Sequence, residues 1–129
     1  MPSAWPADPG SLSKTVRLAA QSASLGSTGL LVGPPSDMYA VDVYLECTTA
    51  GSAGTVLVTV AYTDTNGVAN QVTGALVLTS AAPLTAHLAQ RVVFWVASGD
   101  ITFTSTVTGA VGSPIYAVTV RCARLASTN

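Results

Sequence analysis

Charged residues are scarce in this sequence. They make up 9% of the 129 residues, against roughly a quarter of an average soluble protein, and the net charge is −1. The arginines, Arg17, Arg91, Arg121 and Arg124, are scattered along the chain. Because neither sign of charge clusters, the sequence predicts no surface for nucleic acid and none for an anionic membrane. A chain that is 49% apolar with so few charges instead favours a protein that buries part of its surface in an assembly.

Long hydrophobic runs are also lacking. The longest strongly apolar run covers residues 92–97, far short of the roughly 20 residues that a membrane helix needs. The first ten residues, MPSAWPADPG, contain neither a basic region nor an apolar core, so they do not predict a secretory signal. We therefore expect a soluble protein that is synthesised in the cytoplasm.

The side chains from which catalytic and metal sites are built are few. Two cysteines, Cys47 and Cys122, and one histidine, His87, are too few for a disulfide framework or a clustered zinc site. No G-x-S-x-G elbow is present, and any Ser–His–Asp constellation would have to use His87. Asp42 and Glu46 would lie about 13 Å apart on one strand, too far for a glycosidase pair. We therefore predict no enzyme, no metal and no cofactor.

The two cysteines are expected to be buried and reduced, because both fall on the more apolar face of a predicted strand. A disulfide between them stays open as an alternative, and it requires that their two strands be neighbours.

What the sequence does contain is an alternation of apolar and polar residues with period two. Residues 39–47 show it best, since their odd positions are apolar while Asp42, Tyr44 and Glu46 point the other way. Seven or eight antiparallel strands follow from this pattern, including one over about residues 70–79. The stretch 26–37, GSTGLLVGPPSD, is predicted as a loop with a short apolar insert at residues 30–32. The fold class is all-β, as a sandwich, a jelly roll or a small barrel.

The first residues differ from the rest. Pro2, Pro6, Pro9 and Gly10 predict an extended N-terminal arm over residues 1–12, followed by a single β-sandwich domain over residues 13–129. We expect Trp5 in this arm to contact a neighbouring subunit or a partner, with a disordered tail as the alternative.

The stretch YTDTNG, residues 62–67, resembles half of a calcium-binding loop. With Gly67 at the sixth position of such a loop, the first and twelfth positions would be Tyr62 and Thr73, where carboxylates are required. The stretch is therefore interpreted as the turn of a β-hairpin.

Hydrophobic pairing decides between two turns. A two-residue turn at Asn66 and Gly67 would set Val60 opposite a polar residue, whereas a three-residue loop, 65–67, sets Val60 opposite Val72. The longer loop is predicted, with Asp64 paired to residue 68 and a positive φ at Gly67.

Two aromatic residues are predicted to point outward, Tyr44 and Trp95, together with His87 and Arg91. Exposed aromatics indicate a protein interface or a sugar platform. We favour a subunit interface, because the sequence neighbours are mostly Thr, Ala and Val rather than the hydrogen-bonding groups of a sugar site. The predicted interface residues are Trp5, Tyr44, Arg91 and Trp95.

Three segments together resemble a known class of proteins: GTVLVTVAYTDTNG (54–67), SGDITFTSTVTG (98–109) and PIYAVTVRCARL (114–125). Over about residues 38–125 the chain is similar to small β-sandwich structural proteins of tailed bacteriophages, of the head decoration (cement), head-fibre or tail-associated type. The resemblance implies a jelly-roll-like antiparallel β-sandwich, a homotrimer and attachment to the virion surface, with no cofactor and no catalysis.

On this resemblance the expected partners are further copies of the chain and the major capsid protein of a virion. The protein would bind the capsid after synthesis in the host cytoplasm and reinforce the shell. The alternative is a receptor- or carbohydrate-binding module of a phage tail or fibre, which rests on the outward Trp95 and Tyr44.

Overall fold

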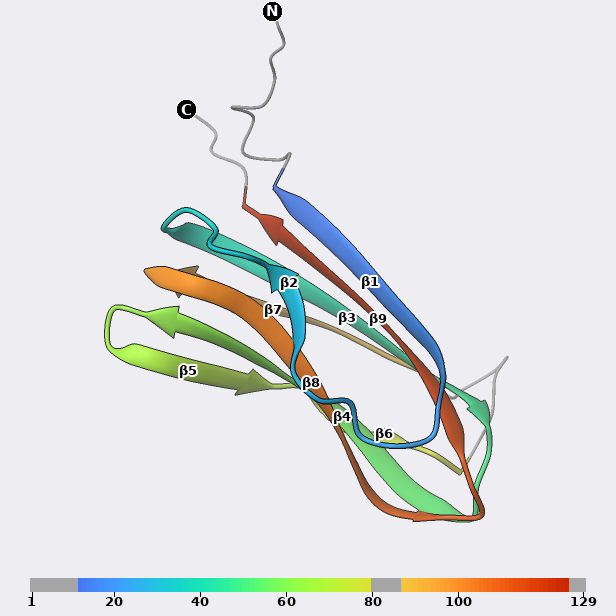
Figure 1. Ribbon diagram of the computed structural model, residues 1–129. Coiled ribbons are helices and arrows are strands. Elements are labelled where there is room, and N and C mark those ends of the chain that lie inside the picture. Colours follow the sequence, from blue (N-terminus) through green and yellow to red (C-terminus); the bar gives the residue numbers. More distant parts are fainter. Residues whose placement is uncertain (1–11, 80–86, 126–129) are drawn as a thin grey trace, which may run out of the picture.

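The computed structural model describes residues 12–79 and 87–125, and this part of the chain contains nine β-strands joined by loops (Figure 1). No helix in this part is long and apolar enough to cross a membrane. The strands are β1 (Ser13–Gln21), β2 (Thr28–Leu31), β3 (Asp37–Thr49), β4 (Ala53–Asp64), β5 (Gly67–Val72), β6 (Leu76–Val77), β7 (His87–Val96), β8 (Ser98–Val111) and β9 (Ile115–Arg124).

Two antiparallel sheets pack face to face. One has the strand order β1-β9-β3-β7, and the other has the order β2-β8-β4-β5 with β6 also paired to β4. The first strands of the chain therefore pair with its last ones, β1 with β9 and β2 with β8. This wrapping is the jelly-roll arrangement, so the predicted all-β, jelly-roll-like sandwich is confirmed. The predicted arm, residues 1–12, falls outside the described residues except for Leu12.

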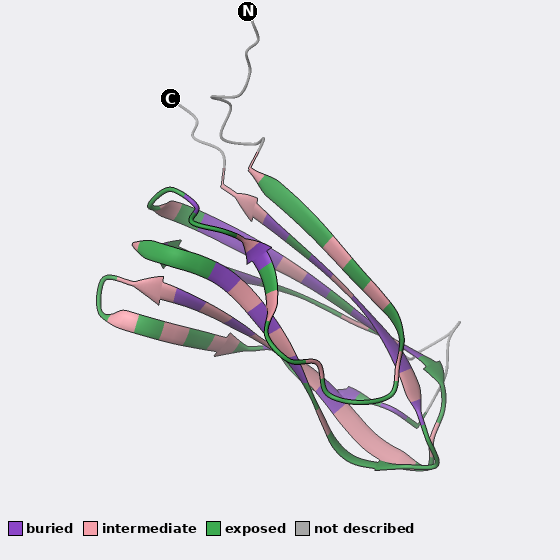
Figure 2. Ribbon diagram, viewed as in Figure 1, coloured by how far each residue is buried: buried purple, intermediate pink, exposed green. Residues whose placement is uncertain are grey.

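The core lies between the sheets, where the period-two pattern places it (Figure 2). The odd residues 39–47 of β3 and the even residues 56–62 of β4 are buried, as the alternation predicts. Tyr62 of β4 stacks on Phe94 of β7 with ring centroids 4.1 Å apart, which joins the two sheets directly. Each fully buried Val or Leu contributes about 1.5–3 kcal/mol, so this core dominates the stability of the fold.

The predicted number of strands, seven or eight, is too low. Residues 28–31 form β2, although glycines and prolines around them predicted a loop, because they pair with β8 more than 65 positions along the chain. Leu30, the centre of the apolar insert, is buried there. The predicted strand at 70–79 is divided into β5 and β6 at Thr73, whose hydroxyl accepts a hydrogen bond from the backbone N–H of Val58 at 3.1 Å. The Thr73 side chain thus takes the place of a ladder bond.

The predicted register of the β4–β5 hairpin is wrong. Asp64 lies opposite Gly67, so the loop consists of residues 65 and 66 alone, and Val60 lies opposite Gln71 rather than Val72. The predicted positive φ at Gly67 is confirmed, at 121°. The Asp64 carboxylate explains the short loop, because its Oδ1 accepts the backbone N–H of Asn66 at 2.7 Å.

Hydrophobic pairing does not set the register of this hairpin because β5 is an edge strand. Its valines face solvent, and Val68 is 78% exposed. The inward Gln71 is accommodated by hydrogen bonds from its Nε2 to the hydroxyl of Tyr62 at 3.0 Å and the carbonyl of Val93 at 3.2 Å. A satisfied polar side chain at the sheet edge therefore costs little.

The cysteines lie on neighbouring strands, β3 and β9, but the register excludes a disulfide. Cys47 lies opposite Tyr116 and Cys122 lies opposite Val41, which places the cysteines about six residues, or roughly 20 Å, apart along the strands. Both thiols are free and buried. Burial raises the pKa of Cys122 to about 12, which makes this thiol unreactive.

Candidate binding face

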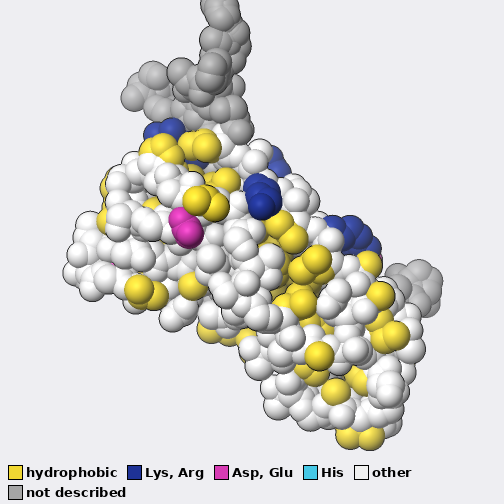
Figure 3. Space-filling model, in the orientation of Figure 1, with side chains coloured by type: hydrophobic (Ala, Val, Ile, Leu, Met, Phe, Trp, Pro, Cys, Tyr) yellow, Lys and Arg dark blue, Asp and Glu magenta, His cyan; other side chains and the backbone are white. Residues whose placement is uncertain are grey.

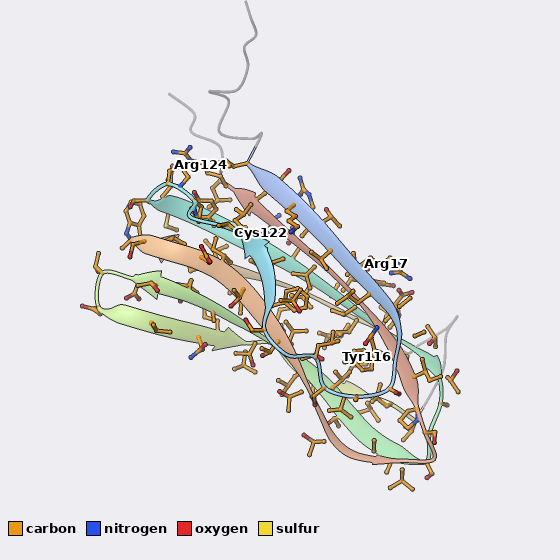
Figure 4. The ribbon with its side chains drawn as sticks, viewed as in Figure 1. Arg17, Tyr116, Cys122 and Arg124 are labelled. Carbon is orange, nitrogen blue, oxygen red and sulfur yellow. The ribbon has the colours of Figure 1, made fainter. Side chains whose placement is uncertain are left out.

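The outward side of the β1-β9-β3-β7 sheet, here called the binding face, collects most of the residues that the sequence singled out. The side chains that alternate outward come from four strands: Arg17 from β1, Thr119 and Arg121 from β9, Met38, Asp42, Tyr44 and Glu46 from β3, and His87, Ala89, Arg91, Val93 and Trp95 from β7. Arg17 points away from the body of the sandwich, whereas Tyr116 of the adjacent strand points inward (Figure 4).

One end of the binding face is apolar. Trp95 lies opposite Met38, and Val93 lies opposite Ala40 in the next cross-strand pair. Trp95 and Val93 are each 42% exposed and Met38 is 37% exposed. We call Met38, Val93 and Trp95 the apolar patch. An exposed tryptophan flanked by other large apolar side chains is a typical feature of a protein interface.

A charged row crosses the middle of the binding face. Asp42 of β3 lies opposite Arg91 on one side and Arg121 on the other. Arg91 donates to both carboxylate oxygens of Asp42, from Nε to Oδ1 at 2.8 Å and from Nη2 to Oδ2 at 3.1 Å. This bidentate contact is the main reason that the pKa of Asp42 is lowered and the pKa of Arg91 is raised.

The second acid of this face is also engaged. Arg17 donates from Nη1 to Glu46 Oε1 at 3.1 Å and to Thr119 Oγ1 at 2.7 Å. Arg121 differs, because no carboxylate of the described residues lies within ion-pair distance of its guanidinium.

A shallow depression of about 370 Å³ lies beside Tyr44. Tyr44, 38% exposed, stacks on His87 with ring centroids 5.9 Å apart. The depression is lined by side chains from β3, β7 and β9: Asp42, Val43, Tyr44, Ala89, Gln90, Arg91, Thr119 and Arg121. The exposed lining of this hollow is mainly apolar, and an aromatic ring, a hydroxyl and two guanidinium groups belong to the residues around it, a composition that suits a small amphipathic molecule.

The opposite side of the molecule has a different surface. The outward residues of β4 and β8 are mainly threonines: Thr55, Thr59, Thr63, Thr102, Thr104, Thr106 and Thr108. In the view with β2 and β8 in front, much of the surface is neither charged nor hydrophobic, hydrophobic side chains are spread over its lower right, and the visible Lys and Arg side chains lie in its upper half (Figure 3). The Lys and Arg residues of the described strands lie on β1, β7 and β9, and none lies on the threonine-rich strands β4 and β8.

The structure brings three of the four predicted interface residues, Tyr44, Arg91 and Trp95, onto one face. Trp5 lies outside the described residues. Tyr44 lies opposite Thr119 and Ala89, in agreement with the expected Thr and Ala surroundings, but Asp42, Arg91 and Arg121 lie beside them on the same face. Sequence reasoning missed Arg121 as one of these neighbours; its outward position follows from the alternation in β9, but the pairing of β9 with β3 cannot be read from local sequence.

The residues that could supply reactive chemistry are not gathered. No group of three or more His, Cys, Asp or Glu side chains that could hold a metal ion occurs among residues 12–79 and 87–125. On the binding face each carboxylate is hydrogen-bonded to an arginine, and the single histidine stacks on Tyr44. What this face offers is hydrogen bonds, charge and apolar area.

No protein-family model and no curated protein matches this sequence. Solved structures with a similar shape include the Eiger TNF of S. frugiperda, with 10% identity over 89% of this chain and 87% of the other and a TM-score of 0.47. The VP2 subviral particle of infectious bursal disease virus is 9% identical over 88% of this chain and 33% of VP2, with a TM-score of 0.44. A family 16 carbohydrate-binding module is 15% identical over 79% of this chain and 70% of the module, with a TM-score of 0.36. With scores this low, function has to be inferred from the residues of this chain.

Proposed function

We propose that this protein is a non-catalytic structural protein of a tailed-phage virion that decorates and reinforces the capsid. Its partners are further copies of itself, as a homotrimer, and the major capsid protein, and it acts on the virion surface. The apolar patch of Met38, Val93 and Trp95 is the observation that carries this proposal, together with the resemblance of the sequence to phage decoration proteins.

The composition of the patch fits a protein partner. Aromatic residues and methionine are enriched in the centres of protein interfaces, and charged residues are depleted there. A sugar site would instead surround Trp95 with hydrogen-bonding groups, but its partner across the strand pair is Met38 and its next outward neighbour on β7 is Val93.

The patch is also held in a fixed shape. Ten consecutive residue pairs, from Asp37 opposite Val96 to Glu46 opposite His87, join β3 to β7. A rigid surface loses little conformational entropy on binding, so a small patch can contribute useful affinity. Threefold symmetry would repeat each contact, and many copies on one shell would act together.

Replacing Trp95 tests this proposal. We expect Trp95→Ala to dissociate the trimer and to abolish binding to undecorated capsids, because it removes the largest apolar group of the patch. Val68→Ala is the matched control, since Val68 is exposed and apolar but lies on β5 of the other sheet. Oligomeric state is measured by sedimentation equilibrium, and capsid binding by co-sedimentation. A wild-type protein that stays monomeric at about 100 μM, or that ignores capsids, would refute the proposal.

A second candidate function is a receptor- or carbohydrate-binding module of a phage tail or fibre. The depression beside Tyr44 favours it, because hydrogen-bonding side chains surround an exposed aromatic ring there. The surroundings of the two aromatics support Tyr44 rather than Trp95 as the sugar platform. Under this function Tyr44→Ala abolishes glycan binding and leaves the oligomer intact, whereas Trp95→Ala leaves glycan binding unchanged.

A further inference from the structure

We propose that the depression beside Tyr44 binds a carboxylated sugar, with the sugar ring against Tyr44 and its carboxylate on Arg121. This inference rests on the second candidate function and names the ligand class for the same site. The charges of the binding face, the spacing of its rows and the room over Ala89 each support it.

The chain has few cationic residues, and most of them lie on the binding face. Of its five Lys and Arg residues, three, Arg17, Arg91 and Arg121, point outward on this one face. Two acids accompany them, Asp42 and Glu46. Each acid already accepts hydrogen bonds from an arginine, which leaves the guanidinium of Arg121 as the positive group available to a ligand. A guanidinium presents a planar fork of donors that matches a carboxylate.

The neighbouring charges favour an anion over a cation. Asp42 lies between Arg91 and Arg121 in one cross-strand row, so this row has one more positive charge than negative. The Asp42 carboxylate is neutralised by its bidentate contact with Arg91 and therefore repels an incoming carboxylate only weakly.

The spacing fits a sugar ring. Thr119 lies directly opposite Tyr44, and Arg121 lies two residues further along β9 on the same face. Diagonal neighbours of this kind are about 7–8 Å apart, a span that one six-membered ring and its carboxylate can bridge. The ring then covers the Tyr44 side chain while the acid group reaches Arg121. Because the Thr119 oxygen accepts from Arg17, its own proton can be donated to a ring hydroxyl.

The small side chain of Ala89 leaves space for a ligand in the depression. Ala89 lies opposite Tyr44 on β7, between the long side chains of His87 and Arg91, and its small methyl group leaves the hollow open. The volume of about 370 Å³ is at the lower end of the range for small-ligand sites, which favours one or two sugar units over a long chain.

The test compares acidic sugars with a neutral one by isothermal titration calorimetry on the full chain. Sialyllactose and trigalacturonate are the acidic probes and distinguish a sialic acid from a uronic acid, and lactose is the neutral probe. We expect at least one acidic probe to bind about tenfold or more tightly than lactose, with the difference shrinking as salt is raised.

Two variants that each remove one positive charge test whether Arg121 belongs to the sugar site. Arg121→Gln should weaken binding of the acidic probe about tenfold, whereas Lys14→Gln, on the edge strand β1, should leave it unchanged. Ala89→Leu should fill the depression and abolish sugar binding. Trp95→Ala should retain sugar binding even where it dissociates the oligomer. Failure of the capsid-decoration proposal can therefore be distinguished from failure of the sugar-binding proposal. Equal binding of lactose, an unchanged affinity in Arg121→Gln, or no acidic-probe binding at about 10 mM would each overturn the inference.

Discussion

A buried chain of hydrogen bonds leads to a quantitative prediction about the fold. Tyr116 of β9 is fully buried, and its hydroxyl lies 2.6 Å from Ser105 Oγ of β8 and donates to the carbonyl of Ala23 at 2.7 Å. Ser105 Oγ also accepts the backbone N–H of Leu25 at 2.9 Å. The order is therefore Leu25 N–H to Ser105, Ser105 to Tyr116, and Tyr116 to Ala23. Residues 23–25 belong to the connection that carries the chain from one sheet to the other, so this network anchors the first crossover of the jelly roll.

Tyr116→Phe removes the central hydroxyl and leaves the rest of the ring in place. The Ser105 hydroxyl then loses its acceptor inside the core, at a cost of about 1–3 kcal/mol. Ala23 is exposed, so its carbonyl can turn to water and adds little. We expect a total loss of about 2 kcal/mol in the free energy of unfolding, which for a domain of this size lowers Tm by about 6–10 °C.

The assay is urea and thermal unfolding followed by circular dichroism. Tyr44→Phe is the matched control, since Tyr44 is exposed, and we expect it to change the free energy by less than about 0.5 kcal/mol. Ser105→Ala and the double variant complete a double-mutant cycle. The loss of unfolding free energy in the double variant should be about 1 kcal/mol smaller than the sum of the losses in the two single variants. Strict additivity, or a loss in Tyr116→Phe no larger than in the control, would refute the network.

Two further predictions concern charge and backbone. Hydrogen bonding lowers the pKa of both Asp37 and Asp42 below their ordinary 3.8, so the stability they contribute is present above pH 4 and is lost as the pH falls through the lowered values. Tm measured from pH 5 to 2 should therefore fall less steeply in the Asp37→Asn/Asp42→Asn variant than in wild type; parallel curves would contradict this. Gly54→Ala should destabilise the protein by about 2 kcal/mol or more, since its φ is +130° and a Cβ would come within 2.9 Å of Ala110, whereas Gly29→Ala, which meets nothing, should be tolerated in the same melts.

The alternation of the sequence was sufficient to predict which side of each long strand is buried. Along β3, β4 and β9 every second residue is apolar over nearly ten positions, and in a sandwich one face of each such strand is buried against the other sheet. Short or partly exposed strands do not obey this rule. β2 has only four residues, and β5 exposes its valines at a sheet edge, so the hydrophobic pattern there carried no information on pairing.

Long-range pairing explains why the charged residues near Tyr44 could not be predicted. Its cross-strand neighbours Thr119 and Ala89 come from strands 75 and 45 residues further along the chain, and Arg121 and Arg91 lie two residues beyond them. The threonine, alanine and valine seen near aromatic residues in the sequence are neighbours along a strand, whereas the chemistry of a sheet surface is set across strands.

The jelly-roll pairing also accounts for the concentration of charge on the binding face. Arg17, Arg91 and Arg121 are far apart in a sequence with almost no charge pattern, yet β1, β7 and β9 all belong to the same four-stranded sheet. Each arginine occupies an outward position of its strand, and each acid of this face lies on β3, between β9 and β7. The two acids hydrogen-bond to two of the three arginines, Arg17 and Arg91. The geometry of the fold, rather than a local motif, therefore leaves the guanidinium of Arg121 on the same face as the exposed ring of Tyr44, and this arrangement underlies the proposed acidic-sugar site.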